Sequence, residues 1–298
     1  MNVQQMSAQM SGKPGFVAAL DQSGGSTPEA LRLYGIPDTA YHSDAEMFEL
    51  IHQMRLRIIT APSFSGEKVI GAILFERTMD SDIGGKPIPS YLWEDRGVVP
   101  LLKVDSGREP ESDGVLMMKP MPRLDALLER AVNKGIYGTK MRSVVRLPSA
   151  SGIASVVAQQ FEVARQISSY GLTPIVEPEV LISSPDKAGA EAILCEEISK
   201  QLALLPADVK VILKLTIPTV ADLYKGLVEH PNVVRVLALS GGYSRHEACA
   251  LLSQNKGMIA SFSRALIEEL RHDMTDAAVD EALVRSIDES YKASVTKA

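Results

Sequence analysis

Cysteine and histidine are scarce in this sequence, and neither is placed where it would form a recognisable metal site. Cys195 and Cys249 are the only cysteines in 298 residues, and neither lies in a CxxC or Cys/His cluster. The five histidines form no HxH or HExxH spacing. We therefore expect a function that needs no metal and no cofactor. Two isolated thiols also favour a reducing compartment over a disulfide framework.

Aromatic residues, excess positive charge and long apolar runs are lacking as well. Aromatic residues make up 5% of the chain, which argues against stacking platforms for single-stranded nucleic acid. The formal net charge is -6, so no basic field would attract phosphate polymers. No apolar run approaches the roughly 20 residues that span a bilayer, and the polar N-terminus lacks the apolar core of a signal peptide. These features predict a cytoplasmic protein without nucleic-acid or membrane partners.

Short runs rich in apolar and β-branched residues recur along the chain and alternate with helix-like segments. Residues 151–170 carry apolar side chains at helical spacing and meet a glycine at their end. Residues 219–222 and 244–247 resemble capping boxes that open helices, and residues 275–291 predict a closing helix. The expected strands are eight: residues 16–21, 69–76, 98–104, 137–145, 173–180, 209–217, 233–239 and 258–263.

Strands that alternate with helices imply βαβ units and a parallel sheet. Eight such units in a chain of this length favour a closed (β/α)8 TIM barrel. An open doubly wound sheet is the alternative, but residues 21–26 (DQSGGS) do not match the GxGxxG pattern expected after its first strand. No linker or charge block divides the sequence, so we expect a single α/β domain over residues 1–298.

Lys214 is a lysine within an otherwise apolar predicted strand, VKVILKLTIP. Side chains two positions apart share a face of a strand, so Ile212 and Thr216 point the same way as Lys214, into the barrel. Leu213 and Leu215 face the outer helices. Burial disfavours an ammonium and lowers its pKa from about 10.4, and a neutral amine can attack a carbonyl.

Other charged residues lie near the C-terminal ends of predicted strands, where barrels carry their active sites. Asp21 stands where the first strand gives way to a loop of hydroxyls and glycines. Three pairs are two positions apart and so share a face: Lys103 with Asp105, Lys140 with Arg142, and Glu177 with Glu179. A single buried charge on a strand is more often a structural ion pair. The placement of all these charged residues near strand ends favours a functional site instead.

The last two predicted strands end in residues suited to an anion. Ser240-Gly241-Gly242 precedes a capped helix, and glycines let backbone N–H groups approach a phosphate. Ser263 and Arg264 follow the eighth strand. Barrels often bind phosphate between the loops after strands seven and eight. A Ser-Gly-Gly turn alone is a weak signal, since glycine serves many turns.

Taken together, these segments resemble the class I fructose-bisphosphate aldolases, in particular their compact bacterial form. The resemblance spans nearly the whole chain and rests on the segments FVAALDQSGGS, GAILFE, LLKVDSG, GTKMRS, PIVEPEV, ILKLTIP, LSGGYS and SFSRAL. It implies metal-independent, reversible cleavage of fructose 1,6-bisphosphate into dihydroxyacetone phosphate and glyceraldehyde 3-phosphate, a step of glycolysis.

The resemblance also implies roles for individual residues. Lys214 would form a Schiff base with the ketose C2, and Glu177 would be the acid/base for that step. Lys140 would tune the iminium site, Asp21 would contact the substrate near C3 and C4, and Glu179 would support the charge network. The C1-phosphate site would comprise Ser240, Gly241, Gly242, Ser263 and Arg264. The C6-phosphate site would comprise Ser23, Ser26 and Lys103, with Arg142 lining the pocket.

Two departures from the animal enzymes leave a question open. Gln22 stands where those enzymes have glutamate, and the sequence ends without their long C-terminal segment, whose terminal tyrosine takes part in proton transfer. Tyr291 is too close to the last predicted helix for that role, so the sequence does not identify the group that protonates the enamine. Two rival functions also stay open: a Schiff-base aldolase for tagatose 1,6-bisphosphate, and a non-catalytic barrel that binds sugar phosphates. The chain could act alone or as an oligomer.

Overall fold

The computed structural model describes residues 3–23 and 26–298 and is built around eight parallel strands that follow the eight predicted segments. Neighbours pair in the order β1-β2-β5-β7-β8-β9-β10-β11. Short β6 (Val115–Leu116) adds to β7 in the antiparallel sense. The parallel strands are β1 Phe16–Leu20, β2 Val69–Leu74, β5 Val99–Lys103, β7 Gly138–Val145, β8 Thr173–Val180, β9 Val211–Thr216, β10 Val233–Leu239 and β11 Met258–Ala260.

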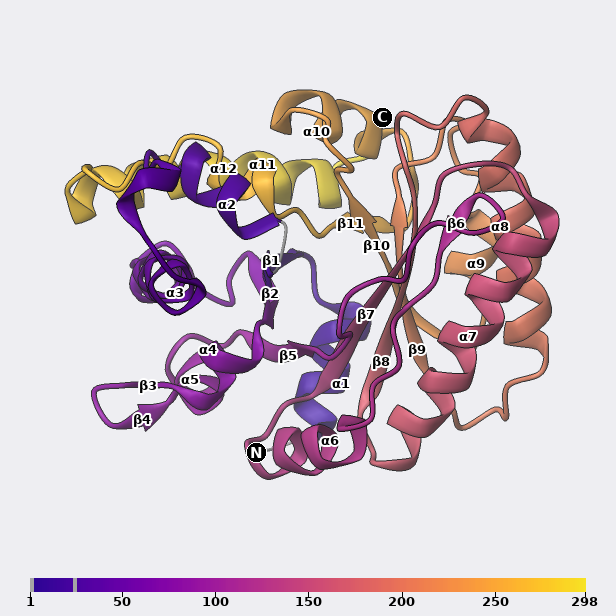
Figure 1. Cartoon of the computed structure of the whole chain (residues 1–298), viewed down its shortest axis with the longest axis horizontal. Coiled ribbons are helices and arrows are strands. Elements are labelled where there is room, and N and C mark those ends of the chain that lie inside the picture. Colours follow the sequence, from indigo (N-terminus) through magenta and orange to yellow (C-terminus); the bar gives the residue numbers. More distant parts are fainter. Residues whose placement is uncertain (1–2, 24–25) are drawn as a thin grey trace.

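The sheet closes on itself between its first and last strands. The backbone N–H of Ala19 donates to the carbonyl of Phe262 over 3.2 Å, just beyond the end of β11. Helices α7 and α8 pack along the outside of β7 to β9 in Figure 1, as expected for βαβ units. The prediction of an α/β TIM barrel is confirmed.

Helices fill the connections between strands. Their bounds are α1 Val3–Gly12, α2 Ser26–Leu33, η1 Asp38–Ala40, α3 Asp44–Thr60, α4 Glu76–Asp80, α5 Ile88–Ser90, the π-helical η2 Tyr91–Asp95, α6 Leu124–Asn133, α7 Ala150–Ser169, α8 Lys187–Ala203, α9 Lys225–Val228, α10 Arg245–Ser253, α11 Arg264–Ile267 and α12 Asp276–Val295. A small hairpin, β3 (Asp82–Ile83) with β4 (Lys86–Pro87), lies between α4 and α5. Within the described ranges, no helix is long and apolar enough to cross a bilayer.

Helix ends largely follow the sequence, with one exception. The capping box at Ser244 and Glu247 opens α10, and Thr275 caps α12. The capping box predicted at residues 219–222 is wrong, because the next helix, α9, begins only at Lys225. Asp222 adopts a left-handed φ of 61°, and its carboxylate accepts from the N–H of Lys256 over 2.7 Å. A hydrogen bond to the connection between α10 and β11 therefore replaces the expected helical turn.

The strands separate an inner core from an outer one. Ile212 and Ile175 belong to the inner cluster inside the barrel, whereas Leu213 and Leu215 pack with the helices in the outer cluster. The strand alternation that places Lys214 inward is therefore confirmed. Apolar side chains of the inner cluster fill the barrel toward the N-terminal ends of the strands. The polar residues at the C-terminal strand ends therefore lie directly above an apolar layer.

Helix α1 covers the N-terminal ends of the strands. Met6 and Met10 are fully buried in the inner cluster. Gln9 Nε2 donates to the carbonyls of Ile70 (2.8 Å) and Gly97 (2.7 Å) near the starts of β2 and β5. The helix closes the lower mouth of the barrel, so the opposite mouth, at the C-terminal strand ends, is left for a site.

Candidate active site

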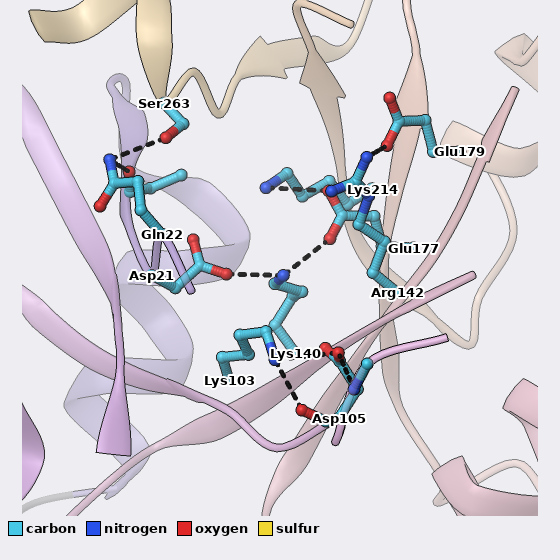
Figure 2. A network of polar contacts seen from close by, with 12 residues as sticks. Asp21, Gln22, Lys103, Asp105, Lys140, Arg142, Glu177, Glu179, Lys214 and Ser263 are labelled. Atoms are coloured by element: carbon cyan, nitrogen blue, oxygen red, sulfur yellow. Dashed lines mark hydrogen bonds and ion pairs between the residues drawn. The ribbon is translucent and has the colours of Figure 1, made fainter. Parts of the chain in front are cut away.

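A cavity of about 970 Å³ lies at the C-terminal ends of the strands. It brings together side chains from β1, β5, β7, β8, β9 and the loops after β10 and β11, which are far apart in the sequence. Figure 2 shows residues from the ends of these strands, with Ser263 from the loop after β11. The predicted site residues that line it are Asp21, Ser23, Lys103, Lys140, Arg142, Glu177, Glu179, Lys214, Ser240, Gly241, Ser263 and Arg264. The side chain of Ser26 lies outside the described part of the structure.

Four side chains form a chain of alternating charge across the barrel. Lys214 Nζ lies 3.1 Å from Glu177 Oε1, and Lys140 Nζ lies 3.0 Å from Glu177 Oε2. Lys140 Nζ also lies 2.6 Å from Asp21 Oδ2. All four residues are buried, and Figure 2 shows Lys140 between the two carboxylates. The buried charges are therefore compensated pair by pair, as burial requires.

This arrangement shifts the proton affinities of the buried groups. Burial alone would raise the pKa of Asp21, but the ammonium groups of Lys140 and Lys214 hold it well below its usual range. The pKa of Glu177 is lowered in the same way, against the effect of its burial. Burial opposes the charge on Lys140, yet the carboxylates of Asp21 and Glu177 raise its pKa. The site thus holds two carboxylates and a protonated lysine at neutral pH.

Two further ion pairs flank this chain. Arg142 pairs with Glu179, and Lys103 Nζ lies 2.9 Å from Asp105 Oδ1 and donates to the Asp105 carbonyl over 2.6 Å. The first pair joins the ends of the neighbouring strands β7 and β8, and the second joins two residues at the end of β5. The backbone of Glu177 is also fixed, because its N–H donates to the side chain of Gln160 on α7 over 2.8 Å.

The loops after β10 and β11 meet as the predicted strand order requires. Gly241 has a φ of 62°, and a Cβ there would lie 2.8 Å from Ile182 Cγ2, so a larger residue would be strained. Gly242 does not line the cavity, but a Cβ on it would lie 3.6 Å from Arg264 Nη2. Arg264 Nη1 also lies 2.8 Å from Glu29 Oε1 on α2. The guanidinium of Arg264 at the predicted phosphate site is therefore already in an ion pair with Glu29.

Gln22 occupies the rim between the first and last strands. Its Nε2 donates to Ser263 Oγ over 2.9 Å, and the neighbouring buried Arg55 donates to the carbonyl of Gln22. The amide thus ties the end of β1 to the loop after β11, beside the predicted phosphate site.

No metal site can be assigned from the described side chains. Residues 3–23 and 26–298 contain no group of three or more His, Cys, Asp and Glu side chains placed to hold an ion. Metal independence stays a prediction.

Comparison with known proteins adds a family to this geometry. Residues 15–217 match the family model for class I fructose-bisphosphate aldolase. The chain is 54% identical to a class 1 fructose-bisphosphate aldolase of Porphyromonas gingivalis over 99% of its length and 100% of the relative's. It is 52% identical to one of Synechocystis sp. over 98% of each chain. The chain belongs to the class I fructose-bisphosphate aldolase family.

Solved structures agree on the fold. A Plasmodium falciparum fructose-bisphosphate aldolase, crystallised with TRAP and a small-molecule inhibitor, superposes with a TM-score of 0.78 at 21% identity. The match covers 98% of this chain and 93% of that one. A Corynebacterium glutamicum protein matches less closely, with a TM-score of 0.57 at 12% identity over 98% and 92% of the two chains. At these identities the likeness supports the barrel alone.

Several cavity residues of this aldolase-family chain were missed by sequence reasoning. Glu29 lies on the helix after β1, and Arg108 and Arg123 lie on the long connection after β5. The rule that loops after the strands build a barrel's site could have indicated all three. Tyr291, which the sequence had excluded, lies on α12 with the Lys68 amine 6.0 Å from its ring centroid, near the start of β2.

Proposed function

We propose that this chain catalyses the reversible, metal-independent cleavage of fructose 1,6-bisphosphate into dihydroxyacetone phosphate and glyceraldehyde 3-phosphate through a Schiff base on Lys214. Family membership supports the reaction. The observation that carries the mechanism is the 3.1 Å contact between Lys214 Nζ and Glu177 Oε1 inside the barrel. A barrel that only bound sugar phosphates would need cationic anchors, but not a buried amine beside a carboxylate.

The first half of the proposed reaction uses Lys214 and Glu177. Glu177 accepts a proton from Nζ, and the free amine attacks the ketose C2 to form a carbinolamine. Glu177 then returns its proton to the departing hydroxyl, so water leaves and an iminium forms. Lys140 is held in place by Asp21 and Glu177, and its charge beside the iminium site tunes the reaction.

The second half of the proposed reaction breaks the C3–C4 bond. Asp21, whose pKa is lowered by the nearby lysines against the effect of burial, is a carboxylate at neutral pH. It takes the proton of the C4 hydroxyl as the bond electrons move into the iminium, giving glyceraldehyde 3-phosphate and an enamine. Protonation at C3 and hydrolysis then release dihydroxyacetone phosphate and the free lysine.

The two phosphates would orient the open-chain sugar across the cavity. Ser240, Gly241, Gly242, Ser263 and Arg264 are proposed for the C1 phosphate, and Ser23, Ser26, Lys103 and Arg142 for the C6 phosphate. Glu179 is proposed to hold Arg142 in position, as their ion pair indicates. A single domain over residues 1–298, a cytoplasmic location and oligomer formation stay predictions.

Borohydride trapping tests this function. Reduction in the presence of dihydroxyacetone phosphate and excess EDTA should attach the triose to Lys214, as peptide mapping would show. Lys214→Met should take up no label while keeping the circular dichroism spectrum, because Glu177 retains Lys140 as a partner. Label on Lys140 or Lys103 would show that this lysine, and not Lys214, is the nucleophile. An unlabelled wild-type protein would favour a binding role.

A further inference from the structure

Two arginines in the cavity differ from all its other cations. Among the described residues, every other lysine or arginine that lines the cavity forms an ion pair with a carboxylate. Arg108 and Arg123 line the same cavity without such a pair within residues 3–23 and 26–298. The substrate proposed above carries two phosphate groups, so uncompensated cations in its cavity are candidate ligands for one of them.

Both arginines project from one connection, the segment between β5 and α6. This segment folds back on itself: Lys119 N–H donates to the Gly107 carbonyl over 3.0 Å, and Glu109 N–H donates to the Met117 carbonyl over 2.9 Å. Arg108 lies inside this hairpin-like fold, and Arg123 immediately precedes α6. The backbone hydrogen bonds at residues 107 and 109 hold the Arg108 backbone on either side.

The position of this connection suits the far end of a long substrate. In the strand order, β5 is third and β10 is seventh. They are four places apart, the greatest separation in a closed barrel of eight strands. A sugar whose C1 phosphate lies at the loop after β10 therefore extends toward the loop after β5 and reaches the side where Arg108 lies.

The electrostatic surroundings of Arg108 favour an incoming anion. Partial burial lowers the pKa of Arg108, and the positive charge of nearby Arg142 lowers it further. Glu179 and Asp105 act in the opposite sense, but they already pair with Arg142 and Lys103. A phosphate dianion at this end would thus relieve repulsion between cations.

We propose that Arg108, assisted by Arg123 at the rim, binds the C6 phosphate and makes the enzyme select ketose 1,6-bisphosphates over ketose 1-monophosphates. This inference rests on the proposed function and adds a residue to it. Lys103 and Arg142 line the same end but are each held by a carboxylate, so they supply orientation and residual charge. Arg108 supplies the uncompensated charge.

The experiment compares Arg108→Ala, Arg108→Lys and Arg123→Ala with a matched control, Arg146→Ala. Arg146 is an arginine of the neighbouring β7 connection that pairs with Glu111 over 2.8 Å, outside this cavity. Each purified full-length protein would be assayed with fructose 1,6-bisphosphate and fructose 1-phosphate for kcat/KM, and by calorimetry for binding of both sugars.

Loss of one charge-assisted phosphate contact should lower kcat/KM for the bisphosphate by roughly 10- to 100-fold in Arg108→Ala. The value for fructose 1-phosphate should stay within about twofold of wild type, since that sugar makes no such contact. Arg108→Lys should fall between wild type and Arg108→Ala, because lysine keeps the charge but not the fork geometry. Arg123→Ala should show a smaller loss of the same kind, and Arg146→Ala should match wild type with both sugars.

Equal losses with both sugars, or no loss with the bisphosphate, would overturn the assignment of Arg108. The binding measurements by calorimetry distinguish a wrong assignment of Arg108 from a wrong proposal of aldolase activity. A wild-type protein that binds the bisphosphate without cleaving it would refute the aldolase reaction, and the preference of Arg108 for the second phosphate would still be measured. Failure of the wild type to bind either sugar would refute both.

Discussion

Glu177 is the residue on which the proton transfers of Schiff-base formation are proposed to depend, because it contacts the amines of both Lys214 and Lys140. Glu177→Gln keeps the shape of the side chain and removes its titrating proton. We expect kcat to fall by roughly 10²–10⁴, as is usual when a general acid/base is lost. Steady-state kinetics with fructose 1,6-bisphosphate would measure this.

Glu179→Gln is the matched comparison for that substitution. Glu179 shares the strand face of Glu177, but its carboxylate pairs with Arg142. Its replacement should weaken substrate binding more than the chemical step, so KM should rise more than kcat falls. A nearly normal Glu177→Gln together with an inactive Glu179→Gln would reverse the assignment of the two carboxylates.

At the scale of elements, helix α1 contributes to stability at the end of the barrel that is remote from the cavity. Met10 is fully buried in the inner core. Met10→Ala should lower the free energy of unfolding by about 2–5 kcal/mol, since it leaves a cavity among packed side chains. The value of kcat should stay near that of wild type. Denaturant titration and kinetics measure the two effects, and Met274→Ala, at a partly buried side chain, should cost less.

The strands were predictable from the sequence, because each is a short apolar run with side chains alternating between two packed faces. Lys214 illustrates this. It lies two positions from Ile212, which faces the inside of the barrel, and therefore points the same way. Local patterns were insufficient where a long-range contact decides the backbone. At Asp222 the hydrogen bond to the Lys256 N–H replaces a capped helix. The short hairpin of β3 and β4 also has no strand-like sequence pattern.

The site was predictable as a set of strand ends, but its pairings were not. The alternation of side chains along the strand indicates that Lys140 faces the barrel interior. Its contacts with both Asp21 and Glu177 depend on the length and the three-dimensional position of the side chains. Arg108 and Arg123 were missed for a related reason. They lie in the long connection after β5, which belongs to the loops that build a barrel's site. The connection has no periodicity, so the sequence does not show which of its side chains turn toward the cavity.

At the scale of the whole molecule, the buried carboxylates make stability depend on pH. Burial would raise the pKa of Asp21, but the neighbouring lysines lower it below its ordinary value of 3.8. Near that pH the unfolded chain therefore binds more protons than the folded one, and stability falls as the pH falls. The contribution of Asp21 is complete well above pH 4 and is lost progressively below it.

Thermal unfolding at pH 5 and at pH 3 would test this coupling. The wild-type melting temperature should drop between these values by more than that of Asp21→Asn, because asparagine does not titrate. The variant is expected to be less stable than wild type at pH 5, where Lys140 has lost one of its carboxylate partners. Identical drops in the two proteins would show that other carboxylates dominate the acid sensitivity.

The alternating chain Asp21–Lys140–Glu177–Lys214 also constrains how this barrel can diverge. Replacing Lys140 by a neutral residue leaves Asp21 without its partner, and breaking a buried pair in this way costs about 3–5 kcal/mol. A lineage acquiring a new activity would therefore have to exchange barrel charges in compensating pairs. Arg108, on a loop and without a carboxylate partner in the described part of the chain, can be replaced in a single step. New substrate preferences should thus arise at the rim of the barrel before the chemistry inside it changes.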